Sequence, residues 1–180
     1  HAGLAFDGDA DRCLAVDEKG ELVDGDKLIA ICAKAYKEKG KLKKDTAVVT
    51  VMSNLGFTYF ARNNDIKMQT TKVGDRYVLE RMLEGGYNLG GEQSGHIIFL
   101  DEANTGDGQL SGAKVLEILA ESGLKMSELA SVMEHFPQVM INVKISPRNR
   151  EVWKNDSQIT DLIEMYENEL GDGGRILVRE

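Results

Sequence analysis

The chain of 180 residues has few cysteines, few histidines and no long apolar run, and each scarcity excludes a class of protein. Its two cysteines, Cys13 and Cys32, both lie in apolar runs. We therefore expect buried, reduced thiols in a cytoplasmic protein, without a disulfide or a CxxC metal site. Its three histidines do not join a nucleophile elbow to form a serine or cysteine triad. Because 18 consecutive apolar residues occur nowhere, we expect no transmembrane helix and no membrane partner.

Positive charge is also scarce. The chain has 22 Lys and Arg against 30 Asp and Glu, which gives a formal net charge of −8. Non-specific binding of nucleic acids depends on neutralising phosphates with Lys and Arg, so we expect no nucleic-acid partner. A small phosphorylated ligand needs only a few local cations and is not excluded.

Strand and helix signals alternate along the chain, which is the pattern of an α/β protein. We expect strands at 3–6, 13–16, 46–51, 66–71, 87–91, 96–100, 139–145 and 175–178. We expect helices at 24–40, 55–63, 76–84, 107–119, 127–134 and 159–170, with Asp24 and Asp107 as N-caps. The first residues look like the middle of a strand and the chain stops at a strand's edge, so the sequence looks like a fragment of a longer protein.

The most informative segment is acidic and lies between the first two expected strands. Asp7, Asp9 and Asp11 stand at alternate positions, with small residues between them and Arg12 directly after. Three such carboxylates can gather around one hard divalent cation, and Mg²⁺ in proteins is usually held by a few carboxylates together with a substrate phosphate. The arginine beside them points to phosphate chemistry.

Other interpretations of these residues differ in how well they fit. An EF-hand loop would start at Asp7 and end at Glu18, but Arg12 occupies its sixth position, where the sharp turn needs glycine. No helix precedes the segment either, so we exclude an EF-hand. A solvated acidic turn and an aspartyl-phosphate phosphatase, in which an early Asp is the nucleophile, both stay open.

Residues 90–96 form a second candidate, rich in glycine. Glycines let the backbone approach a ligand closely, and Glu92 and Ser94 offer hydrogen-bonding groups that suit sugar hydroxyls. His96 could donate to a phosphate or sugar oxygen. The alternative is a hairpin turn in which Glu92 and His96 are merely solvated.

A third candidate lies at the junction of the strand at 66–71 and the helix at 76–84. A helix N-terminus attracts anions, and Lys72 and Arg76 add positive charge there. The alternative has Asp75 as an N-cap and both cations on the surface. Arg179 could bind phosphate, although its position alone indicates only a surface arginine. We interpret 104–108 as a turn with a helix cap and assign it no chemistry.

Taken together and in this order, these motifs resemble those of the α-D-phosphohexomutases. The segments that carry the resemblance are D-G-D-A-D-R at 7–12, T-K-V-G-D-R-Y-V at 71–78, G-E-Q-S-G-H at 91–96, and Arg179. The resemblance implies that Asp7, Asp9 and Asp11 bind Mg²⁺. It implies that Arg12 lies beside the reacting phosphoryl group and that Lys72 is a basic residue near the active site, both of them catalytic. It also implies that Glu92, Ser94, His96 and Arg76 bind the sugar phosphate, and that Arg179 opens a C-terminal phosphate-binding loop.

The resemblance also implies an arrangement of domains, because members of this family have four. Residues 1–16 would end the second domain and carry the metal loop. Residues 17–134 would form the third, a mixed-sheet α/β/α domain. Residues 135–180 would begin an incomplete α+β fourth domain, with Phe136-Pro137 near the boundary.

The implied activity is an isomerisation of a sugar phosphate by two phosphoryl transfers, through a phosphoserine and a bisphosphorylated intermediate. The motifs are most similar to the bacterial branch that interconverts glucosamine 6-phosphate and glucosamine 1-phosphate for UDP-N-acetylglucosamine synthesis. The alternatives are the branch that acts on mannose and glucose phosphates, and a non-catalytic metal- or sugar-binding module. The intact enzyme could form a homodimer. A phosphoserine loop of the type T-A-S-H-N-P has no counterpart here, so we expect this chain alone to be inactive.

Overall fold

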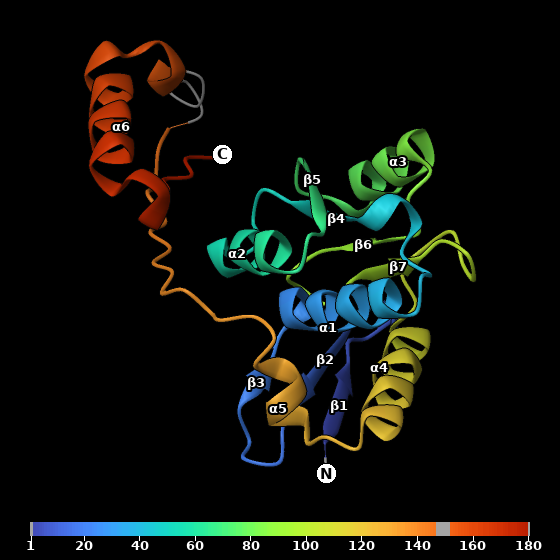
Figure 1. Ribbon diagram of the computed structural model, residues 1–180. Coiled ribbons are helices and arrows are strands. Elements are labelled where there is room, and N and C mark those ends of the chain that lie inside the picture. Colours follow the sequence, from blue (N-terminus) through green and yellow to red (C-terminus); the bar gives the residue numbers. More distant parts are fainter. Residues whose placement is uncertain (1, 147–151, 180) are drawn as a thin grey trace. The chain divides into compact units, whose positions relative to one another are not determined.

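The computed structural model describes residues 2–146 and 152–179 and divides at Phe136–Pro137 into two compact units (Figure 1). The first unit holds two β-sheets and five α-helices, which makes it the α/β fold that the alternating signals predict. The second unit holds one α-helix and two short 3₁₀ helices among its described residues.

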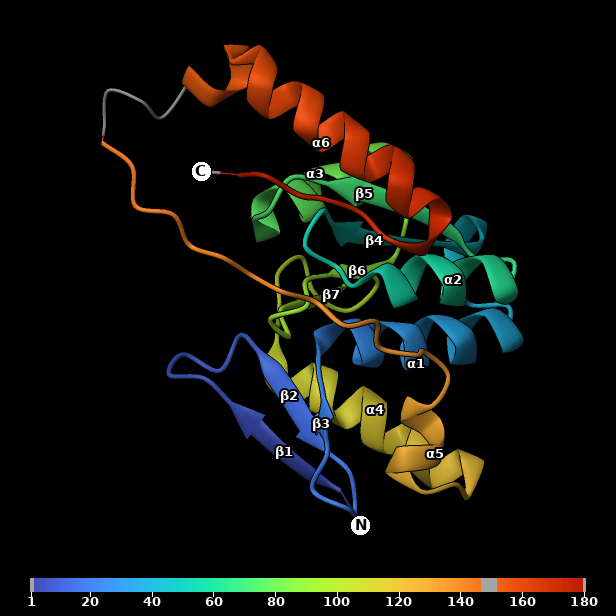
Figure 2. The same ribbon diagram turned by 90° about the vertical axis from the view of Figure 1, so that its left-hand side faces the viewer.

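The first sheet is a small antiparallel one. It consists of β1 (Gly3–Phe6), β2 (Cys13–Val16) and β3 (Leu22–Val23), paired in that order. Gly3 pairs with Val16, and Phe6 pairs with Cys13. The acidic segment 7–12 is therefore the loop that closes the β1–β2 hairpin, as predicted (Figure 2).

The second sheet has the strand order β5-β4-β6-β7, formed by β5 (Lys67–Thr71), β4 (Thr46–Thr50), β6 (Leu89–Gly91) and β7 (Ile97–Phe99). β4 runs parallel to both neighbours, and β7 is antiparallel to β6, so the sheet is mixed. All five residues of β4 are buried, which is what its β-branched run predicts for a central strand.

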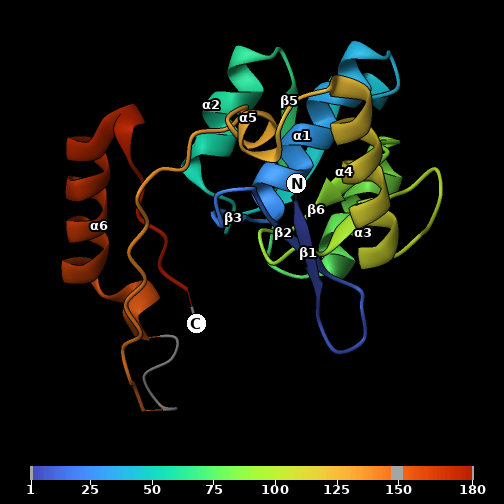
Figure 3. The same ribbon diagram turned by 90° about the horizontal axis from the view of Figure 1, so that it is seen from below.

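Helices cover both faces of this sheet. The helices of the first unit are α1 (Gly25–Glu38), α2 (Leu55–Asn63), α3 (Asp75–Gly85), α4 (Gly108–Ser122) and α5 (Met126–Ala130), the last of which packs on α1. The larger hydrophobic cluster joins the sheet to α1, α2, α4 and α5. A smaller cluster of Val48, Val78, Met82 and Ile98 joins the opposite face to α3. The result is an α/β/α arrangement, and α4 also packs against β1 and β2 (Figure 3).

The helix starts agree with the sequence in two places and differ in a third. The side chain of Asp24 accepts a hydrogen bond from the Lys27 amide, and that of Asp107 accepts one from the Leu110 amide, so both are N-caps as predicted. The expectation that Asp75 could be an N-cap is wrong. α3 begins at Asp75, and the cap position is Gly74, whose φ of 129° favours glycine.

Two expected strands are absent from the described part of the second unit. Residues 139–145 and 175–178 have no regular structure, and the apolar side chains of 139–145 are exposed. Both predictions are wrong, because a β-branched run forms a strand only where a neighbour accepts its hydrogen bonds. The amphipathic helix is present as α6 (Ser157–Leu170), flanked by 3₁₀ turns at Val152–Asn155 and Gly171–Gly173. In the first unit, the helix expected at 127–134 ends at Ala130.

Both cysteines are free and buried, as the composition predicts. Burial raises the pKa of the Cys32 thiol to about 12, so this thiol stays protonated at neutral pH. Among residues 2–146 and 152–179, no helix combines the length and the apolar character that crossing a bilayer requires.

Candidate functional site

The hairpin loop brings three carboxylates together. One carboxylate oxygen from each of Asp7, Asp9 and Asp11 lies within 4.8 Å of the other two. A tight turn causes this convergence: the Ala10 amide donates to the Asp7 carbonyl oxygen at 3.2 Å, and Ala10 has a φ of 59°. The Arg12 amide then donates to Asp7 Oδ1, also at 3.2 Å. The loop is thus curled by its own backbone.

Arg12 accompanies the carboxylates without forming a tight pair. Its Nε lies 3.7 Å from Asp7 Oδ2 and 3.8 Å from Asp11 Oδ1, and the side chain is 50% exposed. Ion pairs of this length and exposure contribute little free energy. Turning the guanidinium towards a phosphate would therefore cost little.

These donors fit a hard divalent cation. All three are carboxylate oxygens, which Mg²⁺ and Ca²⁺ prefer. Asp11 Oδ1 is buried, and no described residue donates a hydrogen bond to it. A buried carboxylate oxygen without a donor is costly, and a bound cation would satisfy it.

Neighbouring loops of the first unit hold this hairpin in place. Arg12 and His96 form an antiparallel backbone bridge, and the Cys13 amide donates to the Gly95 carbonyl oxygen at 3.1 Å. On the other side, the Gly108 amide donates to the Ala10 carbonyl oxygen at 2.9 Å. A Cβ at Gly95 would lie 2.4 Å from the Cys13 oxygen, and one at Gly108 would lie 2.5 Å from the Arg12 oxygen. Close backbone approach therefore requires both glycines.

His96 lies between the hairpin loop and the turn at 104–106. Its side chain is buried, with the residue 4% exposed. Nδ1 lies 3.0 Å from Asp11 Oδ2, and the Gly106 amide donates to Nε2 at 3.1 Å. Both ring nitrogens thus already have partners within the chain.

Glu92 connects the glycine-rich loop to the start of α3. Its Oε1 accepts a hydrogen bond from the Gly74 amide at 3.0 Å. Asp75 Oδ2 also lies 4.0 Å from His96 Nε2. The acidic loop, the loop at 91–96 and the turn at 72–75 therefore meet, and the last two follow the carboxyl ends of β6 and β5. This edge is where open α/β sheets bind their ligands.

The remaining residues that the sequence predicts for the site have no recorded contact with the acidic loop in the described part of the chain. Lys72 and Ser94 lie exposed on these last two loops. On the surface of α3, the Arg76 guanidinium donates to Glu80 at 2.8 Å. Glu80 lies one turn further along the same helix. Arg179 belongs to the second unit.

Sequence reasoning missed the turn at 104–108, to which it assigned no chemistry. Gly106 supports His96, and Gly108 supports the acidic loop, so this turn forms one wall of the site. Its signal was weak, because glycines around an N-cap are common in loops without any function.

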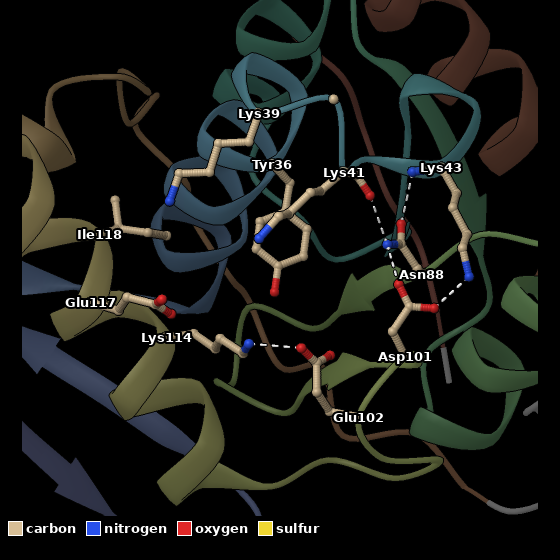
Figure 4. A pocket seen from close by; sticks show the side chains of 11 residues that line it. Tyr36, Lys39, Lys41, Lys43, Asn88, Asp101, Glu102, Lys114, Glu117 and Ile118 are labelled. Carbon is tan, nitrogen blue, oxygen red and sulfur yellow. Dashed lines mark hydrogen bonds and ion pairs between the residues drawn. The ribbon is translucent and has the colours of Figure 1, made fainter.

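A separate cavity of about 370 Å³ lies beyond the last turn of α1 (Figure 4). Lysines and acids line it together, and two of the lysines are paired within it: Lys43 pairs with Asp101, and Lys114 donates to Glu102 at 2.7 Å. The loop at 91–96 instead contacts the first turn of α1, where the Gly25 amide donates to the Gln93 carbonyl oxygen at 3.0 Å. The cavity is therefore at the other end of α1 from the loop at 91–96.

Comparison with known proteins agrees with this fold. The family model of the phosphoglucomutase/phosphomannomutase alpha/beta/alpha domain III matches residues 24–136, and the chain belongs to this family. Among its curated relatives, a phosphoglucosamine mutase of Caldanaerobacter subterraneus is 54% identical over 98% of the chain, and one of Acetivibrio thermocellus is 55% identical over the same share. The chain spans about 40% of the length of these relatives.

Solved structures show the same architecture. A phosphoglucomutase/phosphomannomutase family protein from Burkholderia thailandensis is 28% identical, with a TM-score of 0.66 over 73% of this chain and 29% of that one. An apo N-acetylglucosamine-phosphate mutase, a member of the α-D-phosphohexomutase superfamily, has a TM-score of 0.76 at 22% identity, over 99% of this chain and 42% of that one.

Proposed function

We propose that this chain is the central part of a phosphoglucosamine mutase, which interconverts glucosamine 6-phosphate and glucosamine 1-phosphate in the cytoplasm. The observation that carries the proposal is the convergence of Asp7, Asp9 and Asp11 beside Arg12, held against the loop at 91–96. The identity of 54–55% to relatives of that name supports the choice of sugar. In the proposed arrangement, residues 1–16 end one domain, 17–134 form the next and 135–180 begin a third.

The acidic loop would hold Mg²⁺ through Asp7, Asp9 and Asp11. A solved N-acetylphosphoglucosamine mutase of Aspergillus fumigatus contains magnesium and GlcNAc-6P, and its fold is similar to this one, with a TM-score of 0.65 at 23% identity. The bound ion would neutralise charge on a phosphoryl group in transfer between a phosphoserine and the sugar. Arg12, which is only weakly paired, would turn its guanidinium towards the same phosphoryl group.

The sugar and its second phosphate would be bound by other loops. Glu92 would accept hydrogen bonds from sugar hydroxyl groups and Ser94 would donate to them, while Arg76 in the first turn of α3 would attract phosphate. Lys72, just before α3, would help Arg12 to neutralise charge on the phosphoryl group in transfer. Arg179 of the second unit would add a further phosphate contact. Separate loops for sugar and phosphate suit a bisphosphorylated intermediate, which must bind in two orientations while the metal loop stays in place.

A chimeric enzyme tests this proposal. The chain would replace the corresponding 177 residues of the Acetivibrio thermocellus relative, and phosphate-transfer rates would be compared for glucosamine, glucose and mannose phosphates. We expect Mg²⁺-dependent turnover with glucosamine phosphate preferred, and a large loss of turnover in Asp9→Asn. A folded chimera that prefers mannose or glucose phosphate would assign the chain to the other branch of the family. A folded chimera whose turnover is unaffected by Asp9→Asn would refute the metal site.

A further inference from the structure

We propose that Gln93 is a positioning residue, whose side chain ties the turn at 92–95 to the start of α1 without contacting the sugar phosphate. The turn carries Glu92 and Ser94, so this tie sets where both of them lie. The inference rests on the proposed function, in which these two residues bind the sugar hydroxyl groups. It adds Gln93 and Asp24 to the residues on which sugar binding depends.

The backbone of the turn lies directly on the first residue of α1. The Gly95 amide donates to the Glu92 carbonyl oxygen at 3.0 Å, which closes the turn. The Gly25 amide donates to the Gln93 carbonyl oxygen, also at 3.0 Å. A Cβ at Gly25 would lie 2.2 Å from the Glu92 carbonyl oxygen and 2.6 Å from the Gly95 amide nitrogen. The turn and the helix therefore approach so closely that only glycine fits between them.

The side chain of Gln93 makes a second contact with the same end of α1. Its Nε2 donates to Asp24 Oδ2 at 3.4 Å. The direction of this bond is fixed, because a carboxylate only accepts and the NH₂ group of the glutamine must face it. The bond is long, but the Asp24 side chain is only 13% exposed, so water competes weakly for it.

Asp24 is a rigid anchor for this bond because it also caps the helix. Its Oδ1 accepts from the Lys27 amide at 3.0 Å, so one oxygen of the carboxylate holds α1 and the other holds the turn. The other charged group near Oδ2 is Nδ1 of His135, which at 3.8 Å is too distant for a hydrogen bond. Gln93 would have to release Asp24 in order to bind a sugar itself.

A second anchor holds the opposite side of the turn. Glu92 Oε1 accepts from the Gly74 amide at 3.0 Å, at the start of α3. The turn is thus attached to two helices, and Ser94 is exposed between these attachments. Without the bond from Gln93 to Asp24, the turn could pivot about its remaining contacts. Misplacement of a binding group by about 1 Å is enough to weaken ligand contacts strongly.

An exchange of donor and acceptor between residues 24 and 93 tests this tie. Gln93→Glu keeps the length of the side chain, loses the donor and adds a charge that Asp24 repels. Asp24→Asn keeps an oxygen that caps α1 and places an NH₂ group at the position of Oδ2. The double variant therefore restores the hydrogen bond with its direction reversed. Gln93→Met has neither donor nor acceptor, so Asp24→Asn cannot restore its contact.

The variants would be compared in the chimera with the Acetivibrio thermocellus relative, by measuring KM and kcat for glucosamine phosphate. We expect Gln93→Glu to raise KM by roughly tenfold, the loss of one hydrogen bond to a charged group. We expect kcat to change by less than about threefold, because contacts to the sugar are made in the ground state and the transition state alike. Asp24→Asn should alter KM by less than about threefold alone and should reverse most of the rise in Gln93→Glu, but none of the rise in Gln93→Met.

The opposite results are equally clear. A rise in KM that Asp24→Asn does not reverse would show that Gln93 acts in some other way, such as by binding the sugar. An unchanged KM in both variants of Gln93 would show that the tie is unimportant for sugar binding. Either result would overturn the inference and leave the proposed function intact. An unaltered chimera that folds but does not turn over glucosamine phosphate would refute the proposed function, and the inference with it.

Urea unfolding of the same variants in the 180-residue chain tests the tie without turnover. We expect Gln93→Glu to lower the urea midpoint and Asp24→Asn to raise it again, whereas the midpoint of Gln93→Met should not recover. Independent effects of the substitutions at 24 and 93 would overturn the inference, because no bond would then join the turn to α1.

Discussion

Asp26 is a carboxyl group whose role the sequence does not reveal. It lies in the first turn of α1, it is fully buried, and its Oδ2 accepts a hydrogen bond from the Asn54 amide at 2.6 Å. Burial raises the pKa of this carboxyl from 3.8 to about 6, and the charge of Asp24 adds to the rise. The amide of Asn54, the hydroxyl of Ser53 and the charge of His135 oppose it. Asp26 is one of 30 acidic residues in the sequence, and only its three-dimensional surroundings distinguish it.

The raised pKa predicts how stability depends on pH. Between about pH 4 and pH 6 the folded chain binds the proton of Asp26 more tightly than the unfolded chain, so the contribution of this group to stability falls as the pH rises. We expect Asp26→Asn, which cannot ionise, to gain stability relative to the unaltered chain by roughly 2–3 kcal/mol between pH 4 and pH 7.

Urea unfolding of both chains at several pH values measures this difference. Because the two chains differ only at residue 26, the contributions of all other groups largely cancel in the comparison. A difference that stays constant across this range, or that changes in the opposite direction, would show that the Asp26 carboxyl is not destabilised by burial.

At the scale of elements, Asn54 connects the start of α2 to the end of the first unit. Its Oδ1 accepts hydrogen bonds from the amides of Gly56 and Phe136, both at 2.9 Å, and its Nδ2 donates to the Phe136 carbonyl oxygen at 2.8 Å. The Phe136 ring also stacks on Tyr59 of α2, with 5.1 Å between ring centroids. One amide side chain therefore both caps a helix and fixes the last residue of the unit.

Substitution at Asn54 can separate these two roles. Asn54→Ser retains an N-cap acceptor but is too short to bond both backbone groups of Phe136, whereas Asn54→Ala loses both functions. We expect both variants to speed hydrogen exchange at the Phe136 amide, and Asn54→Ala to lose about 1 kcal/mol more of unfolding free energy than Asn54→Ser. Unchanged protection at Phe136, or equal costs for both variants, would contradict this account of Asn54.

The sequence predicts the elements of the first unit better than those of the second. Helices with caps and apolar faces, such as α1 and α4, and the buried strand β4 appear where local signals place them. Residues 139–145 carry an equally strong β-branched pattern but form no strand. The difference is physical, because a helix satisfies its own backbone, whereas a strand depends on a partner that local sequence does not specify.

At the scale of the whole molecule, the site depends on contacts between segments far apart in the chain. The spacing of Asp7, Asp9 and Asp11 predicts a shared ligand, because alternate positions of a short loop can converge. The link from His96 to Asp11 spans 85 residues and arises from how the two sheets pack, so no local pattern could predict it. The residue types of the site can thus be identified from the sequence, and the fold determines which of them touch.

The central claim is that the acidic loop binds a divalent metal ion. Titration of the 180-residue chain with Mn²⁺, monitored by electron paramagnetic resonance, tests this claim most directly. We predict one saturable Mn²⁺ per chain, displaced by Mg²⁺. Asp9→Asn should weaken this binding by about tenfold or more, while Asp65→Asn, which alters an exposed acid outside the loop, should not. No saturable binding, or equal binding by the Asp9→Asn and Asp65→Asn chains, would show that the loop is only a solvated acidic turn.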